Sequence, residues 1–181
     1  MAHYTTAIEE EILTEAMNHS QRRIEFEYNR FGLSRNHRIN MILIGTIGQL
    51  IFKKFLDKEN IDHKFEYQAG QYDNFDFTIN NKIFEIKTSG YNVNYKRLNL
   101  LYTKDQFESG LKKNFYCCIL VLINGYDRQE KRIKLKNCNK AIIIGGIKYR
   151  NISFYKNAKK FFGDDFKVPL KKLEDIYRLI D

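Results

Sequence analysis

Hydrophobic positions follow helical spacing in the first third of the chain and strand-like spacing after about residue 60. Between residues 38 and 58, apolar side chains occupy more than half of the helix circumference, which is typical of a buried central helix. Asn36 is the expected cap of this helix, and Gly45 and Gly48 would let another segment approach it closely. Residues 5–31 also predict a helix or a helical pair, with apolar residues at helical spacing: Ile8, Ile12, Ala16 and Met17.

Short segments rich in β-branched and aromatic residues dominate the rest of the chain. Strands are expected at residues 63–67, 75–79, 82–88, 115–123 and 141–147. Helices are expected at residues 103–113, 153–162 and 169–180, the last opening with Pro169. The pair Gly145-Gly146 indicates a bulge or a strand end. No linker or repeat divides these segments, so residues 1–181 predict one α/β domain with a mixed β-sheet flanked by helices, preceded by an N-terminal helical segment at about residues 1–35.

The composition places this domain inside the cell. Hydrophobic residues make up 43% and charged residues 29% of the chain, which is typical of a globular protein. Cys117 and Cys118 lie inside an apolar run, so we expect buried, reduced thiols. The sequence has no Cys-x-x-Cys pattern, so a zinc site is not expected. The first fifteen residues carry four glutamates where a signal peptide needs positive charge, and no uninterrupted apolar run is long enough for a membrane span. A soluble cytoplasmic protein is expected.

The net charge indicates the kind of partner. Lysine and arginine number 31 against 22 acidic residues, giving a formal charge of +9. Such a balance favours a polyanion such as nucleic acid, although it would also serve solubility alone.

One pair of predicted strands carries a polar cluster. Residues 75–79 and 82–88 are joined by Asn80-Asn81, which suits a two-residue hairpin turn. Counting outward from that turn sets Asp76 opposite Glu85, with Lys87 on the same face as Glu85. Opposed carboxylates destabilise a strand pair unless a divalent cation lies between them. The alternative is a solvated polar face of a hairpin.

These residues resemble the motif of the PD-(D/E)XK nuclease superfamily. The match is Asp76, eight intervening residues, then Glu85-Ile86-Lys87, and the resemblance extends over about residues 41–123. Phe75 stands where the family name has proline, and Gln49 on the preceding helix stands where the family has a glutamate. The resemblance implies a restriction-endonuclease-like core that hydrolyses DNA phosphodiesters with Mg²⁺, for which Mn²⁺ could substitute. Restriction enzyme, junction resolvase and phage or repair nuclease all remain open, as does RNA as the substrate.

The resemblance also implies a role for each residue of the motif. Asp76 and Glu85 would bind the metal, with the backbone carbonyl of Ile86 as a third ligand. Lys87 would position or activate the attacking water and stabilise the developing negative charge. Gln49 and Gln106 would be auxiliary and would bond metal-bound water or phosphate. Cutting two antiparallel strands calls for a homodimer.

Several segments outside the motif are candidate nucleic-acid contacts. The polar run at residues 88–99 predicts a flexible loop beside the site, with Lys96 and Arg97 as phosphate contacts. Basic residues at 128–140 and 148–160 are interleaved with aromatic residues in the second stretch, where the candidates are Lys148, Arg150 and Lys156. The alternative is that these aromatic residues belong to the core and the lysines face water. Asp73 is a reserve metal ligand, although alternation favours a turn role for it.

Two other functions remain possible from the sequence. A catalytically weak nucleic-acid-binding module would keep the same fold and basic surface, with Gln49 marking decay of the site. A small protein-interaction domain with an incidental basic face is the third interpretation.

Overall fold

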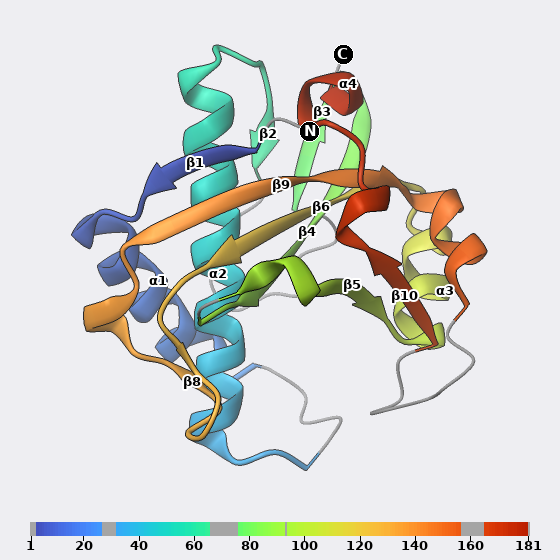
Figure 1. Cartoon of the computed structure of the whole chain (residues 1–181). Helices are drawn as coiled ribbons and strands as arrows, with labels where there is room; N and C mark the ends of the chain where they lie inside the picture. Colours follow the sequence, from blue (N-terminus) through green and yellow to red (C-terminus); the bar gives the residue numbers. More distant parts are fainter. Residues whose placement is uncertain (1–2, 27–31, 66–75, 93, 157–164, 181) are drawn as a thin grey trace.

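A six-stranded mixed sheet crosses the centre of the computed structural model, which describes residues 3–26, 32–65, 76–92, 94–156 and 165–180 (Figure 1). The strand order is β1-β9-β6-β4-β3-β2. The strands are β1 Tyr4–Ala7, β2 Lys64–Phe65, β3 Phe77–Ile79, β4 Lys82–Gly90, β6 Phe115–Ile123 and β9 Lys140–Lys148. Strands β4 and β6 are parallel and every other neighbouring pair is antiparallel.

The parallel pair requires a crossover connection, because two parallel strands cannot be joined by a tight turn. This crossover contains η1 (Tyr95–Arg97), β5 (Asn99–Tyr102) and α3 (Lys104–Lys112). Strand β5 pairs with β10 (Phe166–Pro169) in a separate two-stranded sheet. Residues 88–90 continue β4, so the loop predicted at residues 88–99 is shorter than expected and includes a 3-10 helix.

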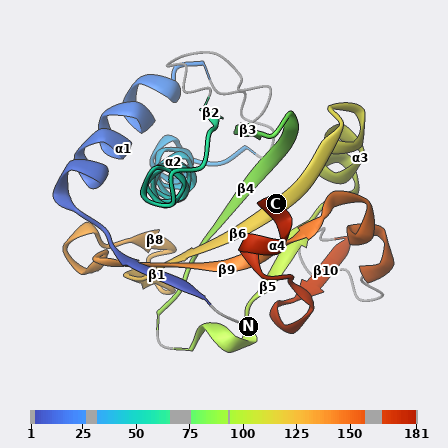
Figure 2. The same cartoon turned by 90° about the horizontal axis from the view of Figure 1, so that it is seen from above.

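The two faces of the sheet are covered by different elements, as Figure 2 shows. Helices α1 (Glu10–Arg23) and α2 (Arg35–Lys58) cover one face, and β5, β10 and α3 lie on the other. Alternate residues of β6 enter the two cores: Cys117, Ile119 and Val121 face α2, whereas Cys118, Leu120 and Leu122 face β5 and α3. Burial on both faces explains why β6 is apolar throughout instead of alternating.

Helix α2 forms the centre of the first core. It begins after Ser34, whose hydroxyl accepts a hydrogen bond from the His37 N–H, so the cap is Ser34 and not Asn36. The close approach predicted at Gly48 is confirmed, since a Cβ there would lie 1.8 Å from Thr88 Oγ1; a Cβ on Gly45 would meet nothing within 4 Å. Helix α2 is also the one described helix long and apolar enough to cross a membrane, and 61% of its most apolar window is buried within the protein.

The chain begins with a strand where the sequence predicted helix. Tyr4 to Ala7 form β1, which pairs antiparallel with β9 at the sheet edge, with Tyr4 opposite Ile143. Its four residues alternate between half-buried and exposed, as an edge strand requires. The helical segment is therefore shorter than expected, because α1 covers only Glu10–Arg23; residues 27–31 of the prediction lie outside the described residues.

The C-terminal helices were also predicted incorrectly. Residues 149–155 form the 3-10 helix η3 (Tyr149–Tyr155), and residues 157–162 of the expected helix lie outside the described part. Pro169 ends β10 and is the N-cap of only a short 3-10 helix, η4 (Leu170–Lys172); the α-helix α4 is limited to Ile176–Ile180. Val168 is fully buried opposite Leu100, so pairing with β5 determines the conformation of this segment.

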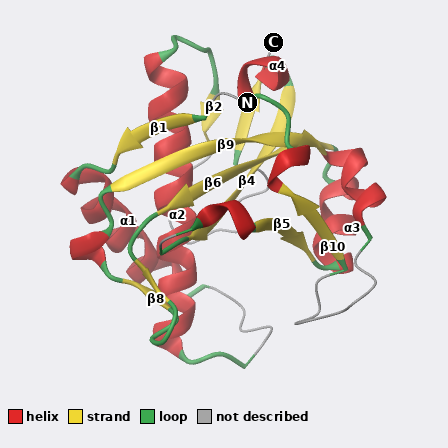
Figure 3. Cartoon of the chain, viewed as in Figure 1, coloured by secondary structure: helices red, strands yellow, loops and turns green. Residues whose placement is uncertain are grey.

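Other predictions are confirmed (Figure 3). Strand β6 has the expected bounds, and α3 starts after the Thr103 cap. The register of β6 against β9 shifts beside Gly145, which has a φ of 130°, so this glycine marks the predicted bulge. Cys117 and Cys118 are buried free thiols, as is Cys138.

Candidate active site

The β3–β4 hairpin has the predicted turn and register. Asn80 and Asn81 have φ angles of 50° and 60°, the left-handed values of a two-residue hairpin turn. Phe77 pairs with Phe84 and Ile79 with Lys82. Asp76 lies one residue before β3 begins, at the end of the hairpin opposite to the Asn80-Asn81 turn.

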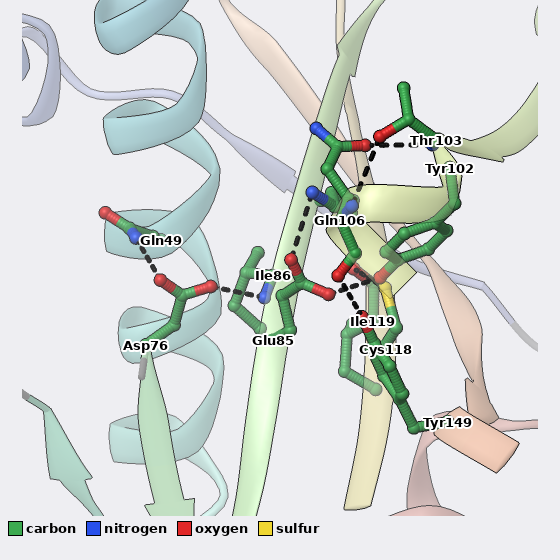
Figure 4. A network of polar contacts seen from close by, with 11 residues as sticks. Gln49, Asp76, Glu85, Ile86, Tyr102, Thr103, Gln106, Cys118, Ile119 and Tyr149 are labelled. Carbon is green, nitrogen blue, oxygen red and sulfur yellow. Dashed lines mark hydrogen bonds and ion pairs between the residues drawn. The ribbon is translucent and has the colours of Figure 1, made fainter. Parts of the chain in front are cut away.

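The Asp76 carboxylate bonds a backbone N–H of β4 that would otherwise pair with a neighbouring strand. Its Oδ2 accepts the N–H of Ile86 at 2.5 Å, where β3 no longer provides a backbone partner. Its Oδ1 accepts a hydrogen bond from Nε2 of Gln49 on α2, also at 2.5 Å (Figure 4). The structure therefore brings Gln49, Asp76 and Ile86 together, and the Asp76 side chain connects α2 to the central strand.

Glu85 and Lys87 project from β4 toward β5. The Nζ of Lys87 lies 3.0 Å from Oε1 of Glu85, and the hydroxyl of Tyr102 donates to the other oxygen of the same carboxylate. The Lys87 ammonium also lies 4.9 Å from the centre of the Tyr102 ring. Glu85 is thus held between a cation and a phenol (Figure 4).

The expected single patch is divided between the two sides of β4. Asp76 contacts its partners on the α2 side, whereas Glu85 and Lys87 contact theirs on the β5 side. The groups still interact electrostatically across the strand, since Glu85 raises the pKa of Asp76 and Lys87 lowers it. The two carboxylates therefore have different partners but remain close enough to affect one another's charge.

Burial determines the protonation of this cluster. It raises the pKa of Asp76 from 3.8 to about 7, with Glu85 adding to the rise and the hydrogen bonds from Ile86 and Gln49 opposing it. Burial is the largest single influence on Lys87 and lowers its pKa, but Glu85, Cys118 and Asp76 together outweigh burial and raise the pKa. At neutral pH the lysine is charged, whereas Asp76 is close to its midpoint, so about half of the Asp76 carboxyl groups are protonated.

Tyr102 is a member of the site that the sequence analysis missed. It is fully buried at the end of β5, and burial raises its pKa well above 10, so it remains a neutral hydrogen-bond donor to Glu85. Cys118, the partner of Glu85 in the β4–β6 ladder, is likewise kept protonated by burial. The only sequence signal was the short apolar run 100–102 before the Thr103 cap.

Gln106 has a structural role in this arrangement. Its side-chain oxygen accepts the N–H of Thr103 at 3.2 Å, and the Thr103 hydroxyl accepts the N–H of Gln106. This reciprocal pair is a capping box that fixes the start of α3. The Gln106 carboxamide oxygen is thus engaged by the helix cap, as Figure 4 shows.

The predicted nucleic-acid contacts lie in separate places. Lys148 and Arg150 are exposed and line a groove of about 590 Å³ together with Lys82, near the start of β4. Lys96 is exposed on η1, which also contains Arg97, and exposed Lys156 forms an isolated bridge to Phe166. Asp73, the reserve metal ligand, lies outside the described residues.

The residues present are compatible with a small, hard cation. Within the described ranges, no group of three or more His, Cys, Asp or Glu side chains could hold a metal ion. Mg²⁺ needs fewer, since one or two carboxylates with water and substrate oxygens complete its shell. The N–H and C=O of one strand residue point to the same edge, so the carbonyl of Ile86 also faces the Asp76 side.

Comparison of the chain with protein-family models, with curated proteins and with solved structures gave no match.

Proposed function

We propose that this chain is a metal-dependent nuclease with a restriction-endonuclease-like core, which hydrolyses phosphodiester bonds of DNA. The observation that carries the proposal is the cluster around β4: the half-buried residue Asp76, whose carboxyl has its pKa raised to about 7, near the Glu85–Lys87 ion pair. The order α2, β3, β4, α3, β6 also agrees with the family that the motif resembles. Cutting both strands would use two chains related by a two-fold axis.

A divalent cation would supply the charge that Asp76 lacks. Asp76 and the Ile86 carbonyl would hold Mg²⁺ or Mn²⁺, and Glu85 would join them by turning away from Tyr102. The ion would polarise a phosphoryl oxygen and make a bound water more acidic. Each carboxylate oxygen has two lone pairs, so a hydrogen bond from Gln49 or Tyr102 leaves one available. A bound cation would offset the repulsion between Asp76 and Glu85, which is one of the causes that raise the pKa of Asp76.

The other residues of the cluster would hold and orient the substrate. The protonated Lys87 amine is positioned by Glu85, so it would direct the attacking water and stabilise negative charge on the phosphorane. Tyr102 fixes the Glu85 carboxylate from the opposite side. Gln49 donates a hydrogen bond to the Asp76 carboxylate and keeps it oriented toward β4.

One observation favours the alternative, a nucleic-acid-binding module with little or no catalysis. Both oxygens of Glu85 and both oxygens of Asp76 already accept hydrogen bonds or an ion pair from the protein. Gln49 satisfies Asp76 directly, whereas a glutamate at that position would repel it and favour a cation.

The decisive experiment measures cleavage of supercoiled plasmid, single-stranded DNA, branched DNA and RNA with Mg²⁺, Mn²⁺ or chelator. Native chain is compared with Lys87→Met and with Lys167→Met, an exposed lysine on β10 that serves as the matched control. We expect metal-dependent cutting that falls by about 100-fold or more in Lys87→Met and is retained in Lys167→Met. Cutting that survives chelation or Lys87→Met would overturn the proposal. Salt-sensitive binding without cutting would support the binding module.

A further inference from the structure

A basic hairpin lies beyond the C-terminal end of β4, the strand that carries Glu85 and Lys87. It is formed by β7 (Tyr126–Asp127), β8 (Arg132–Ile133) and the following 3-10 turn η2 (Leu135–Asn137). In Figure 1 it lies beside the N-terminal half of α2, away from the β3–β4 turn. We propose that this hairpin, residues 126–137, is an arm that binds the phosphate backbone of the nucleic-acid substrate at a distance from the bond that is cut. The inference rests on the proposed function for the nature of the substrate.

The acidic residues of the arm are neutralised within it. Lys134 Nζ lies 2.6 Å from the Asp127 carboxylate and 3.0 Å from Glu130, which also pairs with Arg132. Asp127 additionally accepts the backbone N–H groups at the tip, which fixes the turn. These contacts leave an arm whose acids cannot oppose an approaching polyanion.

Three basic residues of the arm remain available to a ligand. Arg128, Lys131 and Lys136 are exposed, and no ion pair involves any of them among the residues that the structure describes. Lysine and arginine that neutralise phosphates release counterions, and this release drives association with nucleic acid. The arm therefore has the chemistry of a phosphate-backbone contact, with no acidic side chain left unpaired to compete.

The arm is fixed to the helix that carries Gln49. Asn40 of α2 accepts the N–H of Ile133 at 2.9 Å and donates to the carbonyl of Lys131 at 3.4 Å. Asn40 and Gln49 are nine residues apart on α2, which corresponds to about 13 Å along the helix axis. One strand of a duplex advances about 3.4 Å per nucleotide. If the duplex runs along α2, the arm would contact a phosphate roughly four nucleotides from the cleavage position.

Two grooves border the arm, and one of them reaches the residue that follows Lys87. A groove of about 360 Å³ starts at Thr88, the residue after Lys87, and reaches Arg128 between Met41 and Tyr126. A second groove, of about 760 Å³, lies against the same hairpin and includes Lys131 and Lys136 in its lining. The basic groove of Lys148 and Arg150 is at the opposite end of β4, whereas the arm lies beyond the C-terminal end of β4, as does η1 with Lys96.

The test removes the three available charges and compares the variant with a matched control. The arm variant is Arg128→Ala/Lys131→Ala/Lys136→Ala, and the control is Lys167→Ala/Lys171→Ala/Lys172→Ala, three exposed lysines on β10 and η4. Both lose the same charge, and thermal unfolding checks that both remain folded. Binding of a fluorescent DNA duplex is measured in Ca²⁺ over a range of salt concentrations.

We expect the arm variant to bind at least about tenfold more weakly at low salt and the control to bind nearly as the native chain does. The slope of log Kd against log salt should fall by about 2.7 in the arm variant, since each phosphate contact contributes about 0.9. In ethylation-interference experiments, ethyl groups on phosphates about four nucleotides from the cleavage position should weaken binding of the native chain but not of the arm variant.

The outcomes separate this inference from the proposed nuclease. Equal weakening in both triple variants, or native affinity in the arm variant while the native chain cuts DNA, overturns the arm and leaves the nuclease intact. Selective loss of binding in the arm variant of a chain that cuts nothing supports the arm and contradicts the nuclease. Failure of the native chain to bind any duplex overturns both.

Discussion

Replacing Asp76 with asparagine should stabilise the protein above neutral pH. Burial raises the pKa of Asp76 from 3.8 to about 7, so ionising it is more costly in the folded than in the unfolded chain. A tenfold change in proton affinity equals about 1.4 kcal/mol, and the difference corresponds to about 4 kcal/mol. The unfolding free energy of the native chain loses this amount as the pH rises from about 4 to 7, whereas the Asp76→Asn variant carries no charge and does not.

The hydrogen bonds around residue 76 allow this substitution. The asparagine oxygen would accept the N–H of Ile86, as Asp76 Oδ2 does. Its NH2 group would meet Gln49, whose carboxamide can turn over and present its oxygen as the acceptor. A buried donor is therefore not left unsatisfied, and the variant should gain up to about 4 kcal/mol at about pH 8 and nothing below about pH 4.

The assay is urea unfolding of both proteins across this pH range in the presence of a chelator. The native curve alone is insufficient, because buried His19 has a pKa of about 4 and so makes the folded protein more stable as the pH rises from about 4 to 6.5. The difference between the two proteins cancels this contribution. A difference that stays at zero or favours the native chain at about pH 8 would refute the account of the buried carboxyl.

A divalent cation that binds Asp76 should reduce the difference in stability between the native chain and Asp76→Asn. Mg²⁺ or Mn²⁺ added near pH 8 would raise the unfolding temperature of the native chain and leave that of Asp76→Asn nearly unchanged. An equal shift in both proteins would place the bound ion elsewhere.

Three further substitutions test individual contacts by urea unfolding. Gly48→Ala should cost roughly 1–3 kcal/mol, because the new Cβ would lie 1.8 Å from Thr88 Oγ1; part of the loss should be recovered with Thr88→Ala, and additive effects would contradict this contact. Tyr102→Phe should cost about 1.5–3 kcal/mol by removing the hydrogen bond to Glu85, and unchanged stability would show that this bond has no net value. Asn81→Val should lose roughly 1–2 kcal/mol at a φ of 60°, while Asn81→Gly is tolerated; equal effects would argue against strain.

Long segments with strong local signals were predictable. The apolar circumference of α2 and the uninterrupted apolar run of β6 indicated their buried positions. The hairpin register followed from the Asn80-Asn81 turn and from alternation, because a turn and the two strands that it joins are determined by nearby residues. The Thr103 cap of α3 has the same local origin.

Short segments depended on partners far away in sequence. Residues 4–7 become a strand only because β9 offers an open edge, and Pro169 ends a strand because β10 pairs with β5. Segments of four or five residues have little intrinsic preference, so tertiary pairing decides their conformation. The same reason explains why Tyr102 was missed, since its place beside Glu85 depends on how the crossover packs.

The sequence by itself thus determined which residues carry the candidate chemistry: the hairpin register up to Phe77–Phe84 brings Asp76, Glu85 and Lys87 to the same end of the hairpin, because turn and alternation are local properties. The tertiary structure decided what each side chain contacts. Asp76 lies beyond the end of β3 and takes the N–H of Ile86 and the amide of Gln49, while Glu85 meets Tyr102 from the crossover. Alternation determines the face on which a side chain lies, but only the packing of distant segments determines its partner, its burial and its charge.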